Sequence, residues 1–427
     1  MAALLGKAGL NQAAGTPWRL IAAASAGNAL EFYDVIVFGY FIRQIGDAFF
    51  PAADPKSAVL AAWSIFGVAF AARPVGAIML GSYADRAGRK AAMTLSILLM
   101  TLGTALLAFM PRHDSIGALA PVGLLVARLL QGFSAGGEFG GSTAFMLEHG
   151  ARGRRGYIAS FQFTSQAASN IAASLVGLAL TTLMTKPAIA AWGFRLPFIL
   201  GLLIGPVGLY LRSHLAETPE FLAARTLRQP ARALFTRGKW RLALAAGLIA
   251  VGTVIAYVNN YLPSFAVSEL HLPDDTGFVV TLAGSSLLLV VTPLAAIWSD
   301  RVGRLLPAVL GTVVVLVLAI PLMRWVVASP SLGRLLAATL VLGAARAFHG
   351  AVLGALLAEM FPVEIRGVGM SVGYTFGVAV FGGPVGYVCT QAVALSGNKA
   401  APGYVIAAAA VVTLGALWGI GRLRLGK

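Results

Sequence analysis

Residues 128–155, RLLQGFSAGGEFGGSTAFMLEHGARGRR, place an arginine and a glutamate inside an otherwise apolar run. If the run is helical, a step of about 100° per residue brings Arg128, Gln131, Ala135 and Glu138 within about 80° of one another. Each charged side chain that faces lipid costs several kcal/mol. We therefore expect this polar stripe to line a wet interior.

The same stretch carries small residues at helical spacing. Gly132, Gly136 and Gly140 recur every four residues, and so do Gly137 and Gly141. Small residues at this spacing let two helices approach closely within a membrane. We expect a second face of this helix to pack directly against a neighbouring helix.

Gly132 to Gly136 also match the G-x-S-x-G pattern. In soluble hydrolases this pattern forms a strand-to-helix turn that presents a serine nucleophile. Here no strand is expected before the motif, and the run is long enough to cross a membrane, so helix packing is the better interpretation. The enzymatic alternative is an intramembrane serine hydrolase that uses Ser134 and His349. We expect the chain not to be an enzyme.

The composition indicates a polytopic membrane protein. Of the 427 residues, 58% are hydrophobic and only 11% are charged, and the mean hydropathy is +0.82. Soluble domains carry about 25% charged residues. Apolar runs of about 20 residues predict twelve membrane-spanning helices in an all-α fold. They are 18–42, 57–81, 91–111, 118–149, 156–184, 193–212, 241–264, 276–298, 306–326, 332–360, 367–394 and 402–421.

The net charge of +16 does not indicate a nucleic-acid partner. Most of the 32 lysines and arginines lie in segments that face the cytoplasm when both termini are placed there, which is the positive-inside pattern. We therefore predict a multi-pass protein of the bacterial cytoplasmic (inner) membrane, with both termini cytoplasmic, in contact with the lipid bilayer and not with nucleic acid.

The two halves of the chain echo each other. Residues 81–90 read GSYADRAGRK, and residues 299–304 read SDRVGR in the second half. A second echo relates the Glu148-to-Gly156 segment to the Glu359-to-Gly367 segment. This duplication is typical of transporters built from two related bundles around a site near the membrane midplane. We predict an N-terminal six-helix bundle over 1–212, a cytoplasmic linker over 213–240 and a C-terminal six-helix bundle over 241–427.

The repeated polar segments predict a cytoplasmic gate. Asp85 stands where a helix gives way to a tight turn at Gly88, followed by cations at the level of the lipid headgroups. These cations alternatively serve only as topological anchors, but their second copy favours a latch between helices. The residues assigned to this gate are Gly81, Asp85, Arg86, Gly88, Arg89, Glu148, Arg155, Asp300 and Arg301.

Several of these stretches resemble known families. G-x-x-x-D-R-x-G-R-K at Gly81–Lys90 resembles the signature of the major facilitator superfamily. Further stretches resemble the metabolite:proton symporters, and within them the citrate and tricarballylate proton symporters. These stretches are GNALEFYD (27–34), ARPVGA (72–77), RLLQGFSAGGE (128–138), WGFRLPF (192–198), FFP (49–51), FGG (381–383) and GNKAAPGY (397–404). The resemblance is weaker at YVNNY (257–261) and RAFHG (346–350), which replace a Thr-rich segment and a Tyr-Asn-Gly.

The resemblance implies proton-coupled import of a small organic anion, citrate or a related tricarboxylate, by alternating access. The alternatives with the same fold are a dicarboxylate, a shikimate-like acid or a betaine. It also implies that Asp34 pairs with Arg128 and couples transport to protons; a permanent structural ion pair is the other interpretation. Glu31, three residues earlier on the same helix face, and Glu138 are candidates for the same pathway, although Glu138 alternatively only ties helices together.

Polar side chains in the predicted spans are candidates for the substrate site. A carboxylate that enters a low-dielectric cavity must exchange its hydration for cations and hydrogen bonds. The proposed set is Tyr33, Arg128, Gln131, Gln162, Ser165, Gln166, Asn259, Asn260, Tyr261, Arg346 and His349. We expect a monomer whose partners are a small carboxylate and protons, with no cofactor and no metal; no nucleotide-binding G-x-x-x-x-G-K-[ST] motif is present.

Overall fold

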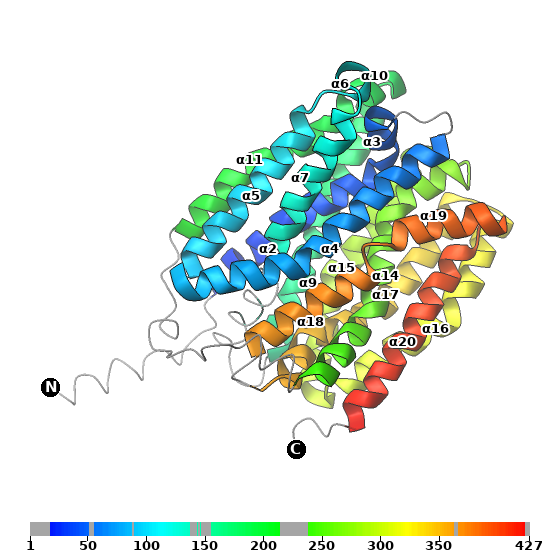
Figure 1. Cartoon of the computed structure of the whole chain (residues 1–427). Coiled ribbons are helices and arrows are strands. Elements are labelled where there is room, and N and C mark those ends of the chain that lie inside the picture. The colour runs from blue at the N-terminus through cyan, green and yellow to red at the C-terminus, as the bar shows by residue number, and fades with distance from the viewer. Residues whose placement is uncertain are drawn as a thin grey trace.

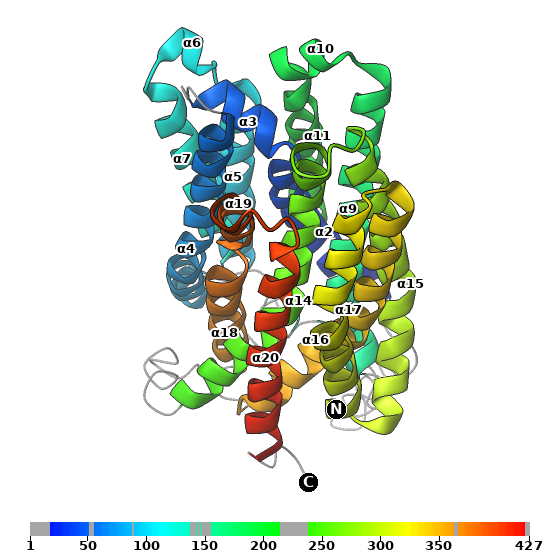
Figure 2. The ribbon, with the colours of Figure 1, turned by 90° about the vertical axis from the view of Figure 1, so that its right-hand side faces the viewer.

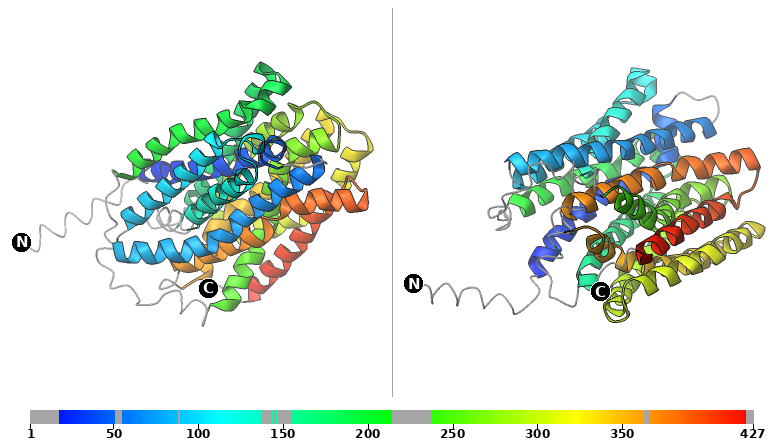
Figure 3. Two further views of the ribbon diagram at one scale, coloured as in Figure 1. Left: turned by 45° about the horizontal axis from the view of Figure 1, so that its top comes forward. Right: turned by 60° about the horizontal axis from the view of Figure 1, so that its bottom comes forward.

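The computed structural model describes residues 18–50, 55–87, 89–136, 143, 146, 155–213, 238–362 and 366–422. Within these residues every regular element is a helix. The long helices run roughly alongside one another in a single bundle (Figure 1), and views from further directions show the same arrangement (Figure 3).

The helices of the N-terminal half precede residue 214, and those of the C-terminal half follow residue 237. The first half contains α2 (Trp18–Tyr40), α3 (Ile42–Phe49), α4 (Pro55–Ala87), α5 (Arg89–Phe109), α6 (His113–Ile116), α7 (Leu119–Ala135), α9 (Arg155–Leu183), α10 (Lys186–Ala191), the 3-10 helix η1 (Gly193–Arg195) and α11 (Leu196–Ser213). The second half contains α14 (Lys239–Ser268), α15 (Thr276–Val302), α16 (Leu305–Ala328), α17 (Leu332–Met360), α18 (Arg366–Phe381), α19 (Val385–Ser396) and α20 (Ala401–Arg422).

The helices agree with most of the twelve predicted spans. In the described part of the chain, eight segments are long and apolar enough to cross a membrane, and α5, α7 and α11 contain shorter apolar stretches. The six spans before residue 214 are α2, α4, α5, α7, α9 and α11, and the second half supplies the other six. The short helices α3, α6 and α10 follow the first, third and fifth spans and gather at one end of the bundle (Figure 2). That arrangement is expected when successive spans cross in alternating directions.

One predicted span differs from the observed helices, and another is only partly described. The span predicted over 367–394 is broken into α18 and α19 at Gly382-Gly383-Pro384, because proline has no N–H and glycine tolerates the turn. The span predicted over 118–149 is described as a continuous helix only as far as Ala135. Glu138, Gly140 and Glu148 lie outside the described residues.

α4 and α7 are in direct backbone contact through glycines. A Cβ atom on Gly132 would lie 1.9 Å from the carbonyl oxygen of Ala69, and one on Gly136 would lie 2.0 Å from that of Arg73. From the other side, a Cβ on Gly76 would lie 1.9 Å from the carbonyl oxygen of Phe133. Any side chain at these positions would force the two helices apart. The predicted packing face is therefore confirmed at Gly132 and Gly136.

The two halves meet along a seam in which α9 packs against α15 and α17, while α4 packs against α18 and α19. Ser174 of α9 shares a 2.9 Å hydrogen bond with Thr281 of α15. The ring of Phe278 covers Gly177, where a Cβ would lie 2.3 Å away. At the α10 end of this seam, Lys186 Nζ lies 2.7 Å from Asp274 Oδ2. The seam between α9 and α15 is thus tied by polar contacts as well as by packing.

Candidate functional site

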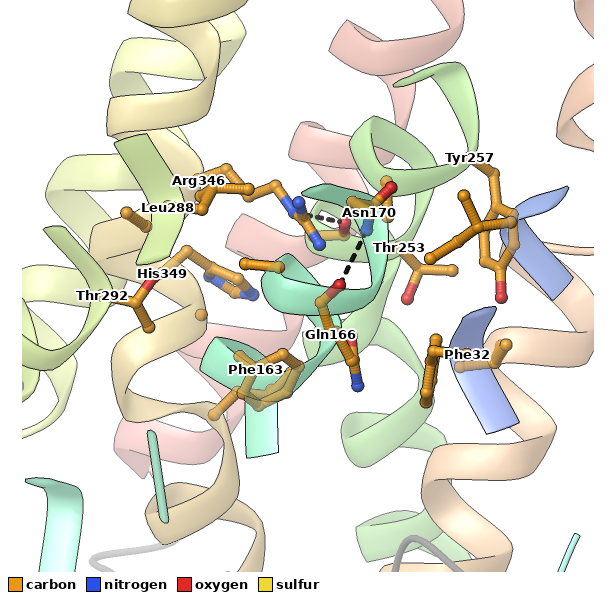
Figure 4. A pocket seen from close by; sticks show the side chains of 18 of the residues that line it. Phe32, Phe163, Gln166, Asn170, Thr253, Tyr257, Leu288, Thr292, Arg346 and His349 are labelled. Atoms are coloured by element: carbon orange, nitrogen blue, oxygen red, sulfur yellow. Dashed lines mark hydrogen bonds between the residues drawn. The ribbon is translucent and has the colours of Figure 1, made fainter. Parts of the chain in front are cut away.

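A cavity of about 60 Å³ lies between the two halves (Figure 4). One side is formed by α2 and α9, and the other by α14, α15, α17 and α18. The polar side chains that line it are Gln166, Asn170, Thr253, Tyr257, Asn260, Thr292, Arg346, His349 and Tyr374. None of the described residues in its wall is a carboxylate, and Arg346 is the only lysine or arginine among them. The wall is therefore suited to an anion.

Arg346 projects from α17 toward α14 and the cavity (Figure 4). Its Nε donates a 3.0 Å hydrogen bond to the carbonyl oxygen of Gly252. This bond fixes the planar guanidinium through Nε, the nitrogen nearest the aliphatic part of the side chain. Among the described residues no hydrogen bond engages its two terminal nitrogens, which remain as donors at the end-on edge, one of the two edges that can bind a carboxylate in a bidentate manner.

The pairing of Asp34 with Arg128 that the resemblance implies is not a direct ion pair in this structure, although the two groups lie within electrostatic reach of each other. Arg128 Nη1 instead donates to Gln131 Oε1 at 2.6 Å. Gln131 Nε2 donates to Thr104 Oγ1 at 3.0 Å and reaches Asp34 Oδ2 at 3.5 Å. Thr104 Oγ1 donates to the same carboxylate oxygen. The amide of Gln131 lies one turn along α7 from Arg128 and so bridges the two charged groups.

The other contacts of Arg128 are aromatic. Its guanidinium carbon lies 4.4 Å from the ring centroid of Phe38 and 5.2 Å from that of Phe66. Such cation–π contacts contribute about 2 kcal/mol or more when the cation is removed from water. With 1% of its surface exposed, Arg128 is held by rings and an amide instead of a carboxylate.

The second oxygen of Asp34 faces α11. Asp34 Oδ1 is buried and has no hydrogen-bond partner in the described part of the chain. A Cβ atom on Gly201 would lie 2.6 Å from it. The absence of a side chain at Gly201 makes room for this oxygen but offers it no hydrogen-bond donor, although a buried carboxylate oxygen is normally paired. An oxygen left without a donor is a natural place for a proton.

Glu31 lies on the same helix as Asp34 but pairs with a different helix. Its Oε1 is 4.0 Å from Nη2 of Arg73 on α4, and the Arg73 guanidinium lies 4.4 Å from the Phe70 ring centroid. The two acids of α2 therefore belong to two separate polar contacts, one with α4 and one with α5 and α7.

Tyr257 connects these charges to the cavity. Its ring packs against Phe66 and Phe70, with centroid distances of 5.9 and 5.1 Å. It lies within electrostatic reach of Arg73, Glu31, Arg128 and Arg346, and its buried hydroxyl has no hydrogen-bond partner among the described residues. Tyr257 was not among the predicted substrate residues, although the three-residue spacing to Asn260 could have placed both on one face of the helix.

The predicted substrate residues divide into two groups. Gln166, Asn260, Arg346 and His349 line the cavity. The others do not line it. Tyr33 donates to the carbonyl of Pro197, Gln162 and Ser165 form hydrogen bonds with Asn28 of α2, and Tyr261 packs against Trp63. Arg128 and Gln131 lie in the Asp34 network, and Asn259 is not part of the wall. Asn170, Thr253, Thr292, Tyr257 and Tyr374 line the cavity and were not predicted.

At the opposite end of the seam from α10, Asp300 caps α9. The amides of Gly156 and Tyr157 each donate a 3.0 Å hydrogen bond to its carboxylate, and Arg304 Nη2 lies 2.5 Å from its Oδ1. A carboxylate at a helix N-terminus satisfies free amides and the helix dipole. Glu359 contacts the same arginine, 3.7 Å from its Nε. Asp300 thus joins the second half of the chain to the first.

The remaining gate residues are described less completely. Gly303 ends α15 with a φ of 92°, a backbone conformation that favours glycine, so the predicted tight turn is observed in the second copy. Arg301 is exposed, and Gly81 lies in α4 with open space beside it. Gly88, Glu148 and the side chains of Asp85, Arg86, Arg89 and Arg155 lie outside the described residues.

The serine hydrolase alternative finds no support in these contacts. Ser134 exchanges hydrogen bonds with Ser96, at 2.7 Å to its carbonyl and 3.0 Å to its hydroxyl. His349 contacts Thr312 instead. The two residues of the suggested catalytic pair thus have different partners.

Known proteins are similar to this chain over most of its length. A family model described as "Sugar (and other) transporter" matches residues 20–245 and 230–420. A citrate-proton symporter of Salmonella typhi is 35% identical over 399 residues, which cover 92% of this chain and 91% of the relative. A proline/betaine transporter of Escherichia coli K12 is 33% identical (93% and 82% covered), and an alpha-ketoglutarate permease of the same strain is 31% identical (87% and 86% covered).

Solved structures share the fold. The proton:xylose symporter XylE bound to 6-bromo-6-deoxy-D-glucose superposes with a TM-score of 0.80 at 16% identity, covering 96% of both chains. Partially occluded inward-open XylE from E. coli gives a TM-score of 0.77 over 96% of this chain and 99% of that one. At this identity the likeness concerns the arrangement of helices alone.

Proposed function

The chain belongs to the sugar (and other) transporter family of the major facilitator superfamily, and from this we propose that it is a proton-coupled symporter of a small organic anion, citrate or a related tricarboxylate. It is a multi-pass membrane transporter and not an enzyme, since its relatives are transporters. In the proposal it works as a monomer in a bacterial inner membrane with both termini cytoplasmic. The two bundles, 1–212 and 241–427, rock about the cavity by alternating access, joined by the 213–240 linker.

The composition of the cavity wall carries this proposal. A tricarboxylate needs surplus cations, whereas a zwitterionic betaine needs an acid opposite its ammonium group. The wall contains Arg346 and no described carboxylate, which favours an anion. Citrate-proton symporters of two organisms are among the relatives. A dicarboxylate is the second candidate, because the alpha-ketoglutarate permease is similar over most of the chain and one guanidinium is enough to hold one end of such a substrate.

Asp34 is the proposed proton carrier, with Glu31 as a second acid and Arg128 as the counter-charge. Asp34 is buried and does not line the cavity, so substrate does not need to touch it. We propose that Gln131, Arg128 and Tyr257 transmit its protonation to the cavity. A change of charge on Asp34 would alter the position of Gln131. Gln131 accepts a hydrogen bond from Arg128, so the position of the Arg128 guanidinium between Phe38 and Phe66 would change as well.

The proposed function is tested by uptake into proteoliposomes. Purified protein is supplied with labelled citrate, 2-oxoglutarate and glycine betaine, with and without an inwardly directed proton gradient. We expect concentrative uptake of a carboxylate that the gradient drives and a protonophore abolishes. Accumulation of betaine without carboxylate uptake, or carboxylate uptake that ignores the proton gradient, would overturn the proposal.

The gate proposal predicts the effect of Asp300→Asn. The amide loses the negative charge that pairs with Arg304 and that caps Gly156 and Tyr157. Breaking a charged, largely buried contact of this kind costs a few kcal/mol. We therefore expect the variant to spend more time open at that end of the seam. In a Cys389→Ala background, a cysteine introduced at Thr292 should be labelled several-fold faster by a membrane-impermeant thiol reagent applied from that side.

Lys239→Gln is the control, because Lys239 begins α14, is exposed and is not one of the gate residues. It should leave the labelling rate unchanged. An Asp300→Asn rate equal to that of the parent would show that the cap does not hold the two halves together.

A further inference from the structure

His349 has one satisfied ring nitrogen and one free one. It lies on α17, one turn after Arg346, with 1% of its surface exposed. Its Nδ1 is 3.2 Å from Thr312 Oγ1 on α16. Its Nε2 is buried without a hydrogen-bond partner in the described part of the chain. In Figure 4 the imidazole projects from α17 into the cavity, on the same side as Arg346.

Thr312 decides which nitrogen carries the proton. Its hydroxyl lies 2.7 Å from the carbonyl oxygen of Ala308, which can only accept. A hydroxyl has a single hydrogen to donate, so Thr312 Oγ1 is left to accept from His349 Nδ1–H. The other tautomer would give up the bond to Ala308 and would leave Nε2–H without a well-aligned acceptor. The carbonyl of Leu248 lies near the ring, but Nε2 makes no bond of acceptable distance and angle with it.

The surroundings of His349 disfavour a charged imidazole. Arg346 is within electrostatic reach on the same helix, and the cavity wall offers no described carboxylate. The other ionisable side chains in the wall are the phenols of Tyr257 and Tyr374. A second cation beside Arg346, away from water, would be repelled without compensation. Neutral His349 with its proton on Nδ1 therefore presents a bare lone pair on Nε2.

We propose that His349 recognises a hydroxyl group of the substrate, so that the transporter selects hydroxylated polycarboxylates. This inference rests on the proposed function, in which the cavity binds a carboxylate. An ionised carboxylate has only acceptor oxygens and is unsuited to a second bare acceptor, and a quaternary ammonium has no N–H to donate. An O–H group satisfies Nε2. Positions three apart on a helix lie about 5–6 Å from each other, which suits a hydroxyl adjacent to a carboxylate held by Arg346.

Thr312 is the positioning residue of this contact. It does not line the cavity, and its effect on substrate passes through the tautomer of His349. Thr312→Val keeps the shape of the side chain but removes the acceptor for Nδ1–H. The proton is then free to move to Nε2, which converts the cavity-facing atom into a donor.

A matched pair of acids tests the proposal. Citrate and tricarballylate carry the same three carboxylates and differ only in the hydroxyl group, and malate and succinate form the equivalent dicarboxylate pair. In proteoliposomes we expect the parent protein to prefer the hydroxylated acid about 10-fold or more in apparent affinity, because a site built for a hydroxyl leaves a polar group unpaired with the analogue. His349→Phe should reduce this ratio to within about 2-fold, because the apparent affinity falls for the hydroxylated acid and not for its analogue.

Two further variants separate recognition from folding. His349→Gln keeps an acceptor and should retain part of the preference, whereas Thr312→Val should lower the ratio without lowering uptake of tricarballylate. Uptake of the non-hydroxylated acid thus serves as the internal measure of folded protein in each variant. Equal affinities in the parent protein, or an unchanged ratio in His349→Phe, would overturn the role of His349 while carboxylate transport stands. Failure of the parent protein to transport any of the four acids would instead remove the proposed function, and this inference with it.

Discussion

We expect Asp34→Asn to abolish accumulation of substrate against its gradient, so that the ratio of internal to external substrate falls to about one. The amide has nearly the shape of the carboxylate and can still accept from Thr104, so the surrounding helices should keep their places. It cannot take up or release a proton. In the proposed mechanism, concentrative transport requires that step in every cycle, whereas exchange of internal for external substrate does not. Counterflow of labelled substrate should therefore survive in the same vesicles.

Glu31→Gln is the matched comparison for this variant. Glu31 lies one turn away on α2 and contacts Arg73 instead of the Gln131 network. If the two acids have separate tasks, Glu31→Gln should retain more of the response to an imposed proton gradient. Undiminished concentrative uptake by Asp34→Asn would remove Asp34 from the coupling mechanism.

Arg346→Lys is expected to weaken a citrate-like substrate strongly although the charge is kept. The backbone contact at Gly252 uses Nε of Arg346 and leaves both terminal nitrogens for two parallel bonds to one carboxylate. An ammonium group is a single point charge and cannot reproduce that geometry. We expect a loss of about 2 kcal/mol, on the scale of hydrogen bonds to charged groups, which is about 30-fold in apparent affinity.

Arg346→Gln extends the test to charge. It should affect tricarboxylates more than monocarboxylates, and the comparison is made by competition against one labelled substrate. Arg334→Lys provides the control, since Arg334 is on the same helix and its guanidinium contacts the carbonyl of Trp325 at an exposed site. Equal losses across mono-, di- and tricarboxylates, or no loss, would show that Arg346 does not hold the anion.

Hydropathy predicted the helices well because lipid requires each span to satisfy its own backbone hydrogen bonds. The spans predicted over 332–360 and 156–184 agree with α17 and α9 to within a residue. Hydropathy does not detect a break in a helix when the residues at the break are not polar. The turn at Gly382-Gly383-Pro384 between α18 and α19 was therefore predicted as continuous helix.

For the site, the sequence predicted only which residues share one face of a single helix. Helical spacing placed Arg128 and Gln131 on one face correctly, but it could not show that the amide of Gln131 would reach Asp34 first. Thr104 is one of several hydroxyl side chains in α5 and also bonds to its own backbone at Met100, so nothing local shows that it would reach Asp34. Gln162 and Ser165 share a stripe with Gln166, yet the proximity of Asn28 on α2 diverts them into a contact between helices. Such choices depend on the packing of helices far apart in the sequence.

The two ties of the α9–α15 seam differ in how they respond to the surrounding solution. Lys186 is 81% exposed and Asp274 31% exposed, so dissolved ions screen their attraction and an exposed pair contributes at most about 1 kcal/mol. The Asp300 and Arg304 side chains are 9% and 15% exposed and are largely shielded from such screening. Ionic strength therefore acts on one end of the seam and hardly on the other. In the proposed cycle we therefore expect concentrated salt to shift the balance between the two open forms toward opening at the α10 end, so that the ionic strength of the medium influences transport.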